Sequence, residues 1–174
     1  AGALSLGDAA TLLKLRGRSM QAAVPSGQGA MAALLGAEMD QAEAAVDAGK
    51  NEGVVTIAND NAPGQIVISG AKAAVEAALA AAKDHGVRKA MMLDVSAPFH
   101  CPLMLPAADA MREALSDVTI NAPAVPVVTN VSADAVTDPE TIRAQLVDQG
   151  TCKVRWRESV AWMAGARVTE FWEV

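Results

Sequence analysis

Aromatic residues are nearly missing from this sequence, and tyrosine is missing altogether. Phenylalanine and tryptophan make up 3% of the 174 residues, although 52% of the residues are hydrophobic. The core is therefore expected to consist of alanine, valine, leucine, isoleucine and methionine. No uninterrupted hydrophobic run approaches the ~20 residues of a membrane span, so we expect no membrane partner.

Positive charge and cysteine are scarce as well. The chain has 14 lysines and arginines against 20 acidic residues, and the formal charge of −6 argues against nucleic acid as a partner. The two cysteines, Cys101 and Cys152, form no C-x-x-C pair, so the sequence predicts neither a metal site nor a disulfide framework. We expect a reducing, cytoplasmic setting.

Two common catalytic signatures are also absent, the G-x-S-x-G elbow and the G-x-x-x-x-G-K-[ST] phosphate loop. The first residues, "AGALSLGDAA", carry no targeting signal and no methionine. The last residues, "VTEFWEV", stop within a predicted strand. Both ends are therefore expected to be cuts through a longer protein.

Turn signals and hydrophobic periodicity divide the chain into three parts. Residues 1–26 hold a helix that starts after Ser5 and ends before Pro25. Residues 27–94 follow the order β-α-β-β-α-β, and residues 95–174 mix helices and strands. We therefore predict an α/β protein in which a ferredoxin-like lobe, 27–94, is inserted between two pieces of a larger domain.

The larger domain is predicted to have too few strands. In the lobe, strands are expected at 30–36, 54–60, 66–70 and 87–95, and helices at 37–49 and 71–86. Beyond it, helices are expected at 100–118, 138–149 and 158–166, and strands at 125–131 (buried) and 168–174. Two strands cannot cover the apolar faces of these helices, so part of the sheet must come from outside this segment. Exposed sheet faces should make the chain prone to aggregation.

Arg16 stands out on the first helix. Leu13, Arg16 and Met20 are three and four residues apart and share one face, with Leu12 beside them. The guanidinium at the edge of this apolar face either snorkels to water or binds an anion.

His100 is one of two histidines, and it lies in "SAPFHCPLM" at the junction of two predicted parts, where clefts form. Its position is compatible with a catalytic base or with a structural histidine. Cys101 is not expected to be its nucleophile, because neighbouring side chains diverge. The other histidine, His85, is expected to stabilise a helix C-terminus.

A basic stripe occurs in "CKVRWRES", where Lys153, Arg155 and Arg157 are spaced two apart. On an extended segment these residues form either a solvated edge or a surface for docking an acidic partner.

Six segments occur in the order and spacing of a known family. They are "LRGRSMQ", "GAMAALLG", "NDNAPGQIVISG", "SAPFHCPLM", "NAPAVPVVTNV" and "VRWRESVAWM". Along its whole length the chain resembles the bacterial malonyl-CoA:acyl carrier protein transacylases. The resemblance implies an α/β-hydrolase-like core, here incomplete, with an inserted ferredoxin-like lobe.

The resemblance also implies roles for individual residues. His100 matches the histidine that serves as base for the serine of a G-H-S-L-G elbow. Arg16 matches the arginine that holds the malonyl carboxylate, and a planar guanidinium fits a carboxylate well. Gln149 matches a residue whose main chain orients the histidine. Met20 and Phe99 are expected to form walls of the acyl pocket.

The chain also departs from the family pattern. The serine elbow would lie upstream of Ala1 and is absent, as is the segment that supplies part of the oxyanion hole. Asn61 is an expected substrate contact, but Asp60 and Ala62 flank it where many relatives carry an aromatic residue and serine.

The function implied for the parent protein is transfer of malonyl from CoA to the phosphopantetheine thiol of acyl carrier protein. The enzyme would act as a monomer without a cofactor, through a malonyl-serine ester, in fatty acid synthesis. The chain alone lacks the nucleophile and is expected to be inactive. Two alternatives stay open, a non-catalytic module that binds carrier protein or CoA, and an acyltransferase of a polyketide pathway.

Overall fold

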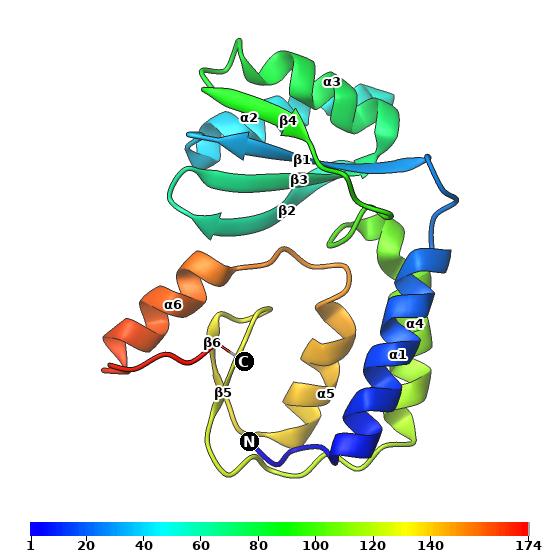
Figure 1. Cartoon of the computed structure of the whole chain (residues 1–174), viewed down its shortest axis with the longest axis vertical. Coiled ribbons are helices and arrows are strands. Elements are labelled where there is room, and N and C mark those ends of the chain that lie inside the picture. Colours follow the sequence, from blue (N-terminus) through cyan, green and yellow to red (C-terminus); the bar gives the residue numbers. More distant parts are fainter. Residues whose placement is uncertain (174) are drawn as a thin grey trace.

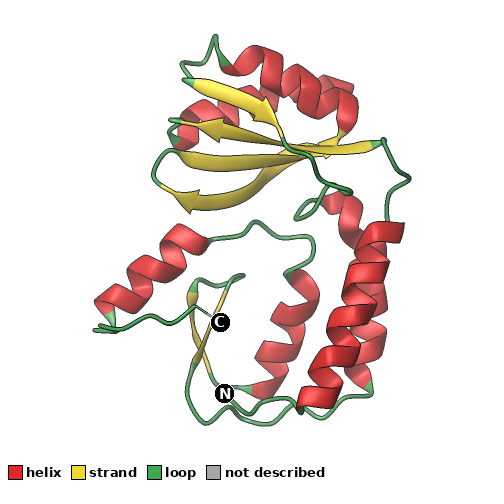
Figure 2. Cartoon of the chain, in the orientation of Figure 1, coloured by secondary structure: helices red, strands yellow, loops and turns green. Residues whose placement is uncertain are grey.

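The computed structural model describes residues 1–173, which form a sheet-containing lobe and a second, mainly helical region (Figure 1). Figure 2 shows that the longer strands all lie in the lobe. The lobe consists of β1 (Gly29–Leu35), α2 (Met39–Gly49), the short 3-10 helix η1 (Lys50–Glu52), β2 (Val55–Ala62), β3 (Gln65–Ala71), α3 (Lys72–Ala82) and β4 (Lys89–Met92).

The four strands of the lobe form one antiparallel sheet in the order β2-β3-β1-β4. The helices α2 and α3 cover the same face of this sheet (Figure 1). The sequence of elements is the β-α-β-β-α-β order predicted for this part of the chain. Each β-α-β half of the lobe places one helix, α2 or α3, on the covered face of the sheet. The opposite face is directed toward the helical region.

Small side chains allow the lobe to pack tightly. Eight alanines belong to its core, together with larger residues such as Leu34 and Ile68, which are both 0% exposed. Gly49, at the end of α2, shows how close the two helices come. A Cβ atom at this position would lie 2.4 Å from the carbonyl oxygen of Ala74 in α3, so only glycine fits the contact.

The helical region is built on two helices that lie side by side, α1 and α4 (Figure 1). Its core contains Leu12 of α1, Met111 and Leu115 of α4, and Ile142 and Val147 of α5. The elements are α1 (Leu6–Ala22), the 3-10 helix η2 (Pro102–Met104), α4 (Leu105–Ser116), β5 (Val127–Thr129), β6 (Asp134–Val136), α5 (Pro139–Asp148) and α6 (Trp156–Gly165).

Two helices begin where the sequence predicts. The hydroxyl oxygen of Ser5 accepts a hydrogen bond from the backbone N–H of Asp8 at 3.0 Å, which caps α1. Asp138 accepts the N–H of Thr141 at 2.8 Å, and Pro139 occupies the first position of α5. In both cases a side chain satisfies a backbone donor that the helix itself leaves free.

The structure corrects several predicted strands. Residues 168–173 form no strand, and Val174 lies outside the described residues. The strand predicted at 125–131 is reduced to β5, which is half-buried and pairs with the unpredicted β6. The strand predicted at 87–95 is limited to β4. β4 pairs with β1 over only four residues, and β5 pairs only with the three-residue β6.

The exposed apolar side chains lie mainly on helices and on the last residues, and on the sheet they are found in the edge strand β4, at Met91 and Met92. Leu13 was expected on the packed face of the first helix, yet it is 67% exposed. Trp172 is 81% exposed, whereas Met31 and Ser69, on the sheet face opposite α2 and α3, are buried. Within residues 1–173 no helix is long and apolar enough to cross a membrane.

Candidate functional site

A pocket of about 260 Å³ lies where α1 meets the turn that leads into η2. Its lining brings together four residues singled out in the sequence, namely Arg16, Met20, Phe99 and His100, with Gly17 beside them. Arg16 and Met20 come from one face of α1, and Phe99 and His100 come from the turn. Residues more than 80 positions apart thus share one small pocket.

The turn that carries His100 is held in place on both sides. Pro98 and Cys101 are fully buried, and the thiol of Cys101 donates a hydrogen bond to the carbonyl oxygen of Pro98 at 3.1 Å. His100 itself adopts a φ of 58°, a left-handed conformation that a residue with a side chain seldom takes. The buried neighbours therefore fix a strained backbone that places the imidazole at the pocket.

Cys101 is unsuited to act as a nucleophile. Its side chain is 0% exposed, and burial raises the pKa of the thiol, which keeps the sulfur protonated. The structure therefore agrees with the expectation that His100 does not activate its neighbour.

The imidazole of His100 has a defined partner. Its Nδ1 atom lies 3.1 Å from the main-chain carbonyl oxygen of Gln149, at the end of α5. A carbonyl oxygen can only accept a hydrogen bond, so Nδ1 must carry the proton. In the neutral ring the other nitrogen, Nε2, then has a free lone pair and can accept a proton from a reacting group.

The electrostatic surroundings favour this neutral form. Burial lowers the pKa of His100, the carbonyl of Gln149 raises it, and the positive charge of Arg16 lowers it again. The net effect is a pKa below the ordinary histidine value of about 6.5. Near neutral pH the ring is therefore uncharged and available as a base.

Arg16 lies half-buried on α1, and its guanidinium donates a hydrogen bond to the side-chain oxygen of Gln149. Burial lowers the pKa of this arginine as well. Among residues 1–173 no carboxylate pairs with Arg16, although six other arginine or lysine side chains there form ion pairs with acidic partners. A half-buried guanidinium that has only an amide as partner can accept an anion.

Gln149 therefore touches both groups. Its main-chain oxygen faces His100, and its side-chain oxygen faces Arg16. The sequence indicated only the main-chain contact, through the family resemblance. The side-chain contact spans 133 positions and has no local signal in the sequence.

Met20 forms a wall of the pocket. It is 4% exposed and belongs to a small apolar cluster with Met104 and Ala107, against which Phe99 packs. Through Met20 and Phe99, this cluster forms the apolar side of the pocket.

Asn61 lies elsewhere. It is near the end of β2 and lines a separate, open depression with Gln65, Val154 and Trp156. The structure does not bring Asn61 to the pocket of His100 and Arg16.

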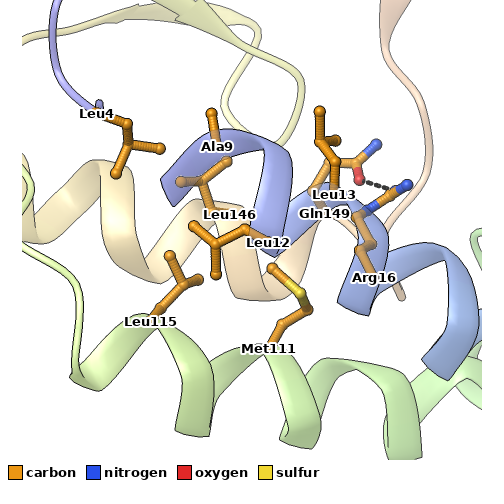
Figure 3. A pocket seen from close by; sticks show the side chains of 9 residues that line it. All are labelled: Leu4, Ala9, Leu12, Leu13, Arg16, Met111, Leu115, Leu146 and Gln149. Atoms are coloured by element: carbon orange, nitrogen blue, oxygen red, sulfur yellow. Dashed lines mark hydrogen bonds between the residues drawn. The ribbon is translucent and has the colours of Figure 1, made fainter. Parts of the chain in front are cut away.

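A larger apolar groove of about 430 Å³ runs between α1, α4 and α5 (Figure 3). Figure 3 shows leucine and methionine side chains along it, with Arg16 and Gln149 joined at one end. Arg16 thus borders both this groove and the smaller pocket. In the part of the chain that is described, no three histidine, cysteine, aspartate or glutamate side chains form a group that could hold a metal ion.

The predicted basic stripe does not form one extended edge. Only Val154 pairs with a strand, and α6 starts at Trp156. Arg155 pairs with Glu158, and Arg157 pairs with Asp60 of β2. Two of the three cations are thus occupied by acidic partners within the molecule, which disfavours the stripe as a surface for an acidic partner.

The chain belongs to the acyl transferase domain family, which matches residues 1–169. Among curated proteins, it is 45% identical over 174 residues to the malonyl CoA-acyl carrier protein transacylase of Escherichia coli K12, and this covers 100% of the chain and 56% of that protein. The chain therefore spans about half the length of the curated relatives it matches.

Solved structures agree with this assignment. The acyl-carrier-protein-S-malonyltransferase of Bartonella henselae is 49% identical with a TM-score of 0.91, over 94% of this chain and 52% of that one. A malonyl-transacylase solved in complex with a type II polyketide acyl-carrier protein is 40% identical with a TM-score of 0.93, over 97% of this chain and 54% of that one. The α/β fold of the chain is thus the fold of the matching half of malonyltransferases.

Proposed function

We propose that this chain supplies the general base and the carboxylate anchor of a malonyl-CoA:acyl carrier protein transacylase. The observation that carries the proposal is the arrangement around Gln149, whose two oxygens face His100 and Arg16. It places a neutral imidazole and a guanidinium without an anionic partner on one small pocket. The names of the relatives point to the same reaction.

The arrangement of the two regions fits the predicted fold. We interpret the antiparallel sheet with α2 and α3 on one face as a ferredoxin-like lobe, 27–94. Residues 1–26 and 95–174 then belong to an α/β-hydrolase-like core whose main sheet is not part of this chain. The apolar groove between α1, α4 and α5 supports this interpretation, because such a face is normally covered in a folded core.

In the first half of the proposed reaction, a serine from outside this chain attacks the thioester carbonyl of malonyl-CoA. The Nε2 atom of His100 takes the proton of the serine hydroxyl as the new C–O bond forms. The C–S bond then breaks, and the CoA sulfur leaves with the proton that the imidazolium returns. The product is a malonyl-serine ester and free CoA.

The second half of the reaction reverses these steps with a different thiol. His100 takes the proton of the phosphopantetheine thiol on the carrier protein, and the sulfur attacks the ester carbonyl. The serine oxygen leaves and regains its proton from His100. The main-chain oxygen of Gln149 stabilises the imidazolium in both halves, because it accepts the proton on Nδ1 in a hydrogen bond. No cofactor or metal is needed for these steps.

Arg16 would select the acyl group. A malonyl carboxylate that enters the pocket can replace the side-chain oxygen of Gln149 on the guanidinium, exchanging a neutral acceptor for a charged one. Hydrogen bonds to charged groups contribute about 1.5–3 kcal/mol, which corresponds to a preference for malonyl over acetyl of about tenfold or more. Met20 and Phe99 limit the size of the acyl group.

The test uses the full-length protein that contains this chain. Arg16→Ala should lower malonyl transfer from CoA to carrier protein by about tenfold or more, while acetyl transfer changes much less. Lys14→Ala, on an exposed position of the same helix, is the matched control. Equal losses with both acyl groups would contradict the role of Arg16 as carboxylate anchor. The chain alone should take up no label from radioactive malonyl-CoA.

The structure solved with a polyketide carrier protein supports a second candidate, in which the acceptor belongs to polyketide synthesis. Comparing carrier proteins of the fatty acid and polyketide types as acceptors would separate the two, since the chemistry at His100 is the same in both.

A further inference from the structure

A bidentate ion pair connects the lobe to the segment that follows Gln149. The Nε atom of Arg157 donates to the two carboxylate oxygens of Asp60 at 2.9 and 3.1 Å, and Nη2 donates to one of them at 2.6 Å. The side chain of Asp60 is 2% exposed, whereas that of Arg157 is 44% exposed. The hydrogen bonds to Asp60 raise the pKa of Arg157, so the guanidinium stays charged.

Backbone hydrogen bonds reinforce the same contact. The N–H of Asp60 donates to the carbonyl oxygen of Val154 at 2.8 Å, and the N–H of Val154 donates to the carbonyl oxygen of Ala58 at 2.7 Å. These bonds form a short parallel bridge between β2 and the segment before α6. The ion pair and the bridge together form what we call the Asp60 clamp.

The clamp lies only a few residues from the partner of His100. Gln149 ends α5, and the N–H groups of Thr151 and Cys152 donate to the carbonyl of Asp148 at 3.1 and 3.0 Å. The chain then runs directly to Val154 in the bridge. The carbonyl that faces His100 is therefore held between a helix end on one side and β2 on the other.

A second set of contacts holds the same segment from the helical region. Arg155 donates through its backbone N–H to the side chain of Asn130 at 3.0 Å and through its guanidinium to the carbonyl of Val131 at 2.9 Å. These contacts orient the start of α6, but they do not reach the lobe. Only the Asp60 clamp, among the contacts in the described residues, ties this segment to β2 by side-chain charges.

We infer that Asp60 and Arg157 are positioning residues, which keep the Gln149 carbonyl on His100 by fixing the 149–157 segment to the lobe. The inference rests on the proposed function insofar as His100 is the base. The physical reason is that a buried carboxylate that loses its charge or its partner no longer holds the guanidinium, and the segment gains freedom to move away from β2. The carbonyl of Gln149 then shifts relative to the imidazole, which loses its fixed tautomer.

The experiment records ring ¹⁵N signals of the histidines in the 174-residue chain at a pH where His100 is neutral. The chain has only two histidines, and the exposed His85 provides an internal reference. In the unmodified chain the His100 ring should show one protonated nitrogen, Nδ1, and one unprotonated nitrogen, Nε2. In Asp60→Asn this difference between the two nitrogens should be largely lost, because the ring exchanges between tautomers.

Arg157→Lys gives a second measurement in case Asp60→Asn fails to fold. Lysine keeps the positive charge but cannot form the bidentate contact with the carboxylate. We therefore expect a smaller loss of the difference between the two ring nitrogens than in Asp60→Asn. Asp109→Asn, which removes an exposed ion pair with Arg112 on α4, is the control and should leave the ring signals unchanged. Circular dichroism checks that each variant is folded.

The outcomes separate the two proposals. A folded Asp60→Asn or Arg157→Lys chain that keeps the unmodified ring signals would overturn the positioning role and leave the proposed function standing. An unmodified chain with the proton of His100 on Nε2 instead would contradict the proposed base geometry itself, and with it the positioning role.

Discussion

The lobe and the helical region bury their hydrophobic residues to very different extents. In the lobe, α2 and α3 cover one sheet face, so that residues on it such as Ile68 are completely enclosed, and part of the opposite face is buried as well, including Met31 and Ser69. In the helical region, α1, α4 and α5 share a core but leave an apolar groove open beside it. The comparison teaches that one half of this chain contains what it needs to pack, and that the candidate site lies entirely in the other half, beside the turn that connects the two.

The largest expected effect tests how closely the lobe is packed. Leu34→Ala removes a side chain that is 0% exposed in β1 and should lower the free energy of unfolding by about 2–5 kcal/mol. Leu13→Ala, on the exposed side of α1, should change it by about 0.5 kcal/mol or less. Urea denaturation followed by circular dichroism measures both. If both substitutions lowered the free energy of unfolding equally, Leu13 would be packed against other residues in solution, and the groove would be covered.

An intermediate effect concerns the groove itself. Leu13→Asp places a charge at the groove without removing a buried group, so it should lower the binding of an apolar fluorescent dye and the tendency of the chain to associate. Leu79→Asp, on α3 of the lobe, is the comparison, since this partly buried residue packs against the lobe core and its change should destabilise instead. Unchanged dye binding in Leu13→Asp would place the exposed apolar surface elsewhere.

The smallest effect is a dependence of stability on pH. Burial lowers the pKa of His100 in the folded chain below its unfolded value of about 6.5. Above about pH 6.5 His100 is unprotonated in both the folded and the unfolded chain, so it does not change the stability. As the pH falls below about 6.5, the unfolded chain binds the proton first and stability decreases, until the folded pKa is also passed. His100→Gln should remove this part of the pH dependence, as measured by denaturation at several pH values.

The sequence predicted the lobe better than the helical region, for a physical reason. The lobe alternates short elements with turn residues, so local patterns locate its strands and helices, although β1 pairs with β3 and β4 and not with β2, the next strand in the sequence. In the helical region, β5 and β6 are paired strands of three residues each, which carry little periodicity, and residues 168–173 pair with no strand among the described residues.

The candidate site was predicted only in part. The helical spacing put Leu13, Arg16 and Met20 on one face, and the structure agrees, since Arg16 lines the groove with Leu13 and the smaller pocket with Met20. The spacing did not predict that Leu13 would be exposed at the open groove. The contact of His100 with Gln149 followed from the family resemblance alone. The pair of Asp60 with Arg157 was missed, because residues 97 positions apart show no mutual signal in a single sequence.

The positions of the tryptophans have a consequence for spectroscopy. Trp156, Trp162 and Trp172 are the only tryptophans, and the chain has no tyrosine. All three lie in α6 or after it, and Trp156 also borders the lobe, where it lines a depression with Asn61 and Gln65. Intrinsic fluorescence therefore reports on the C-terminal end of the helical region and on its contact with the lobe, and not on the lobe core. Circular dichroism follows the helices of both regions. Unfolding curves recorded by the two methods will therefore coincide only when the two regions unfold together.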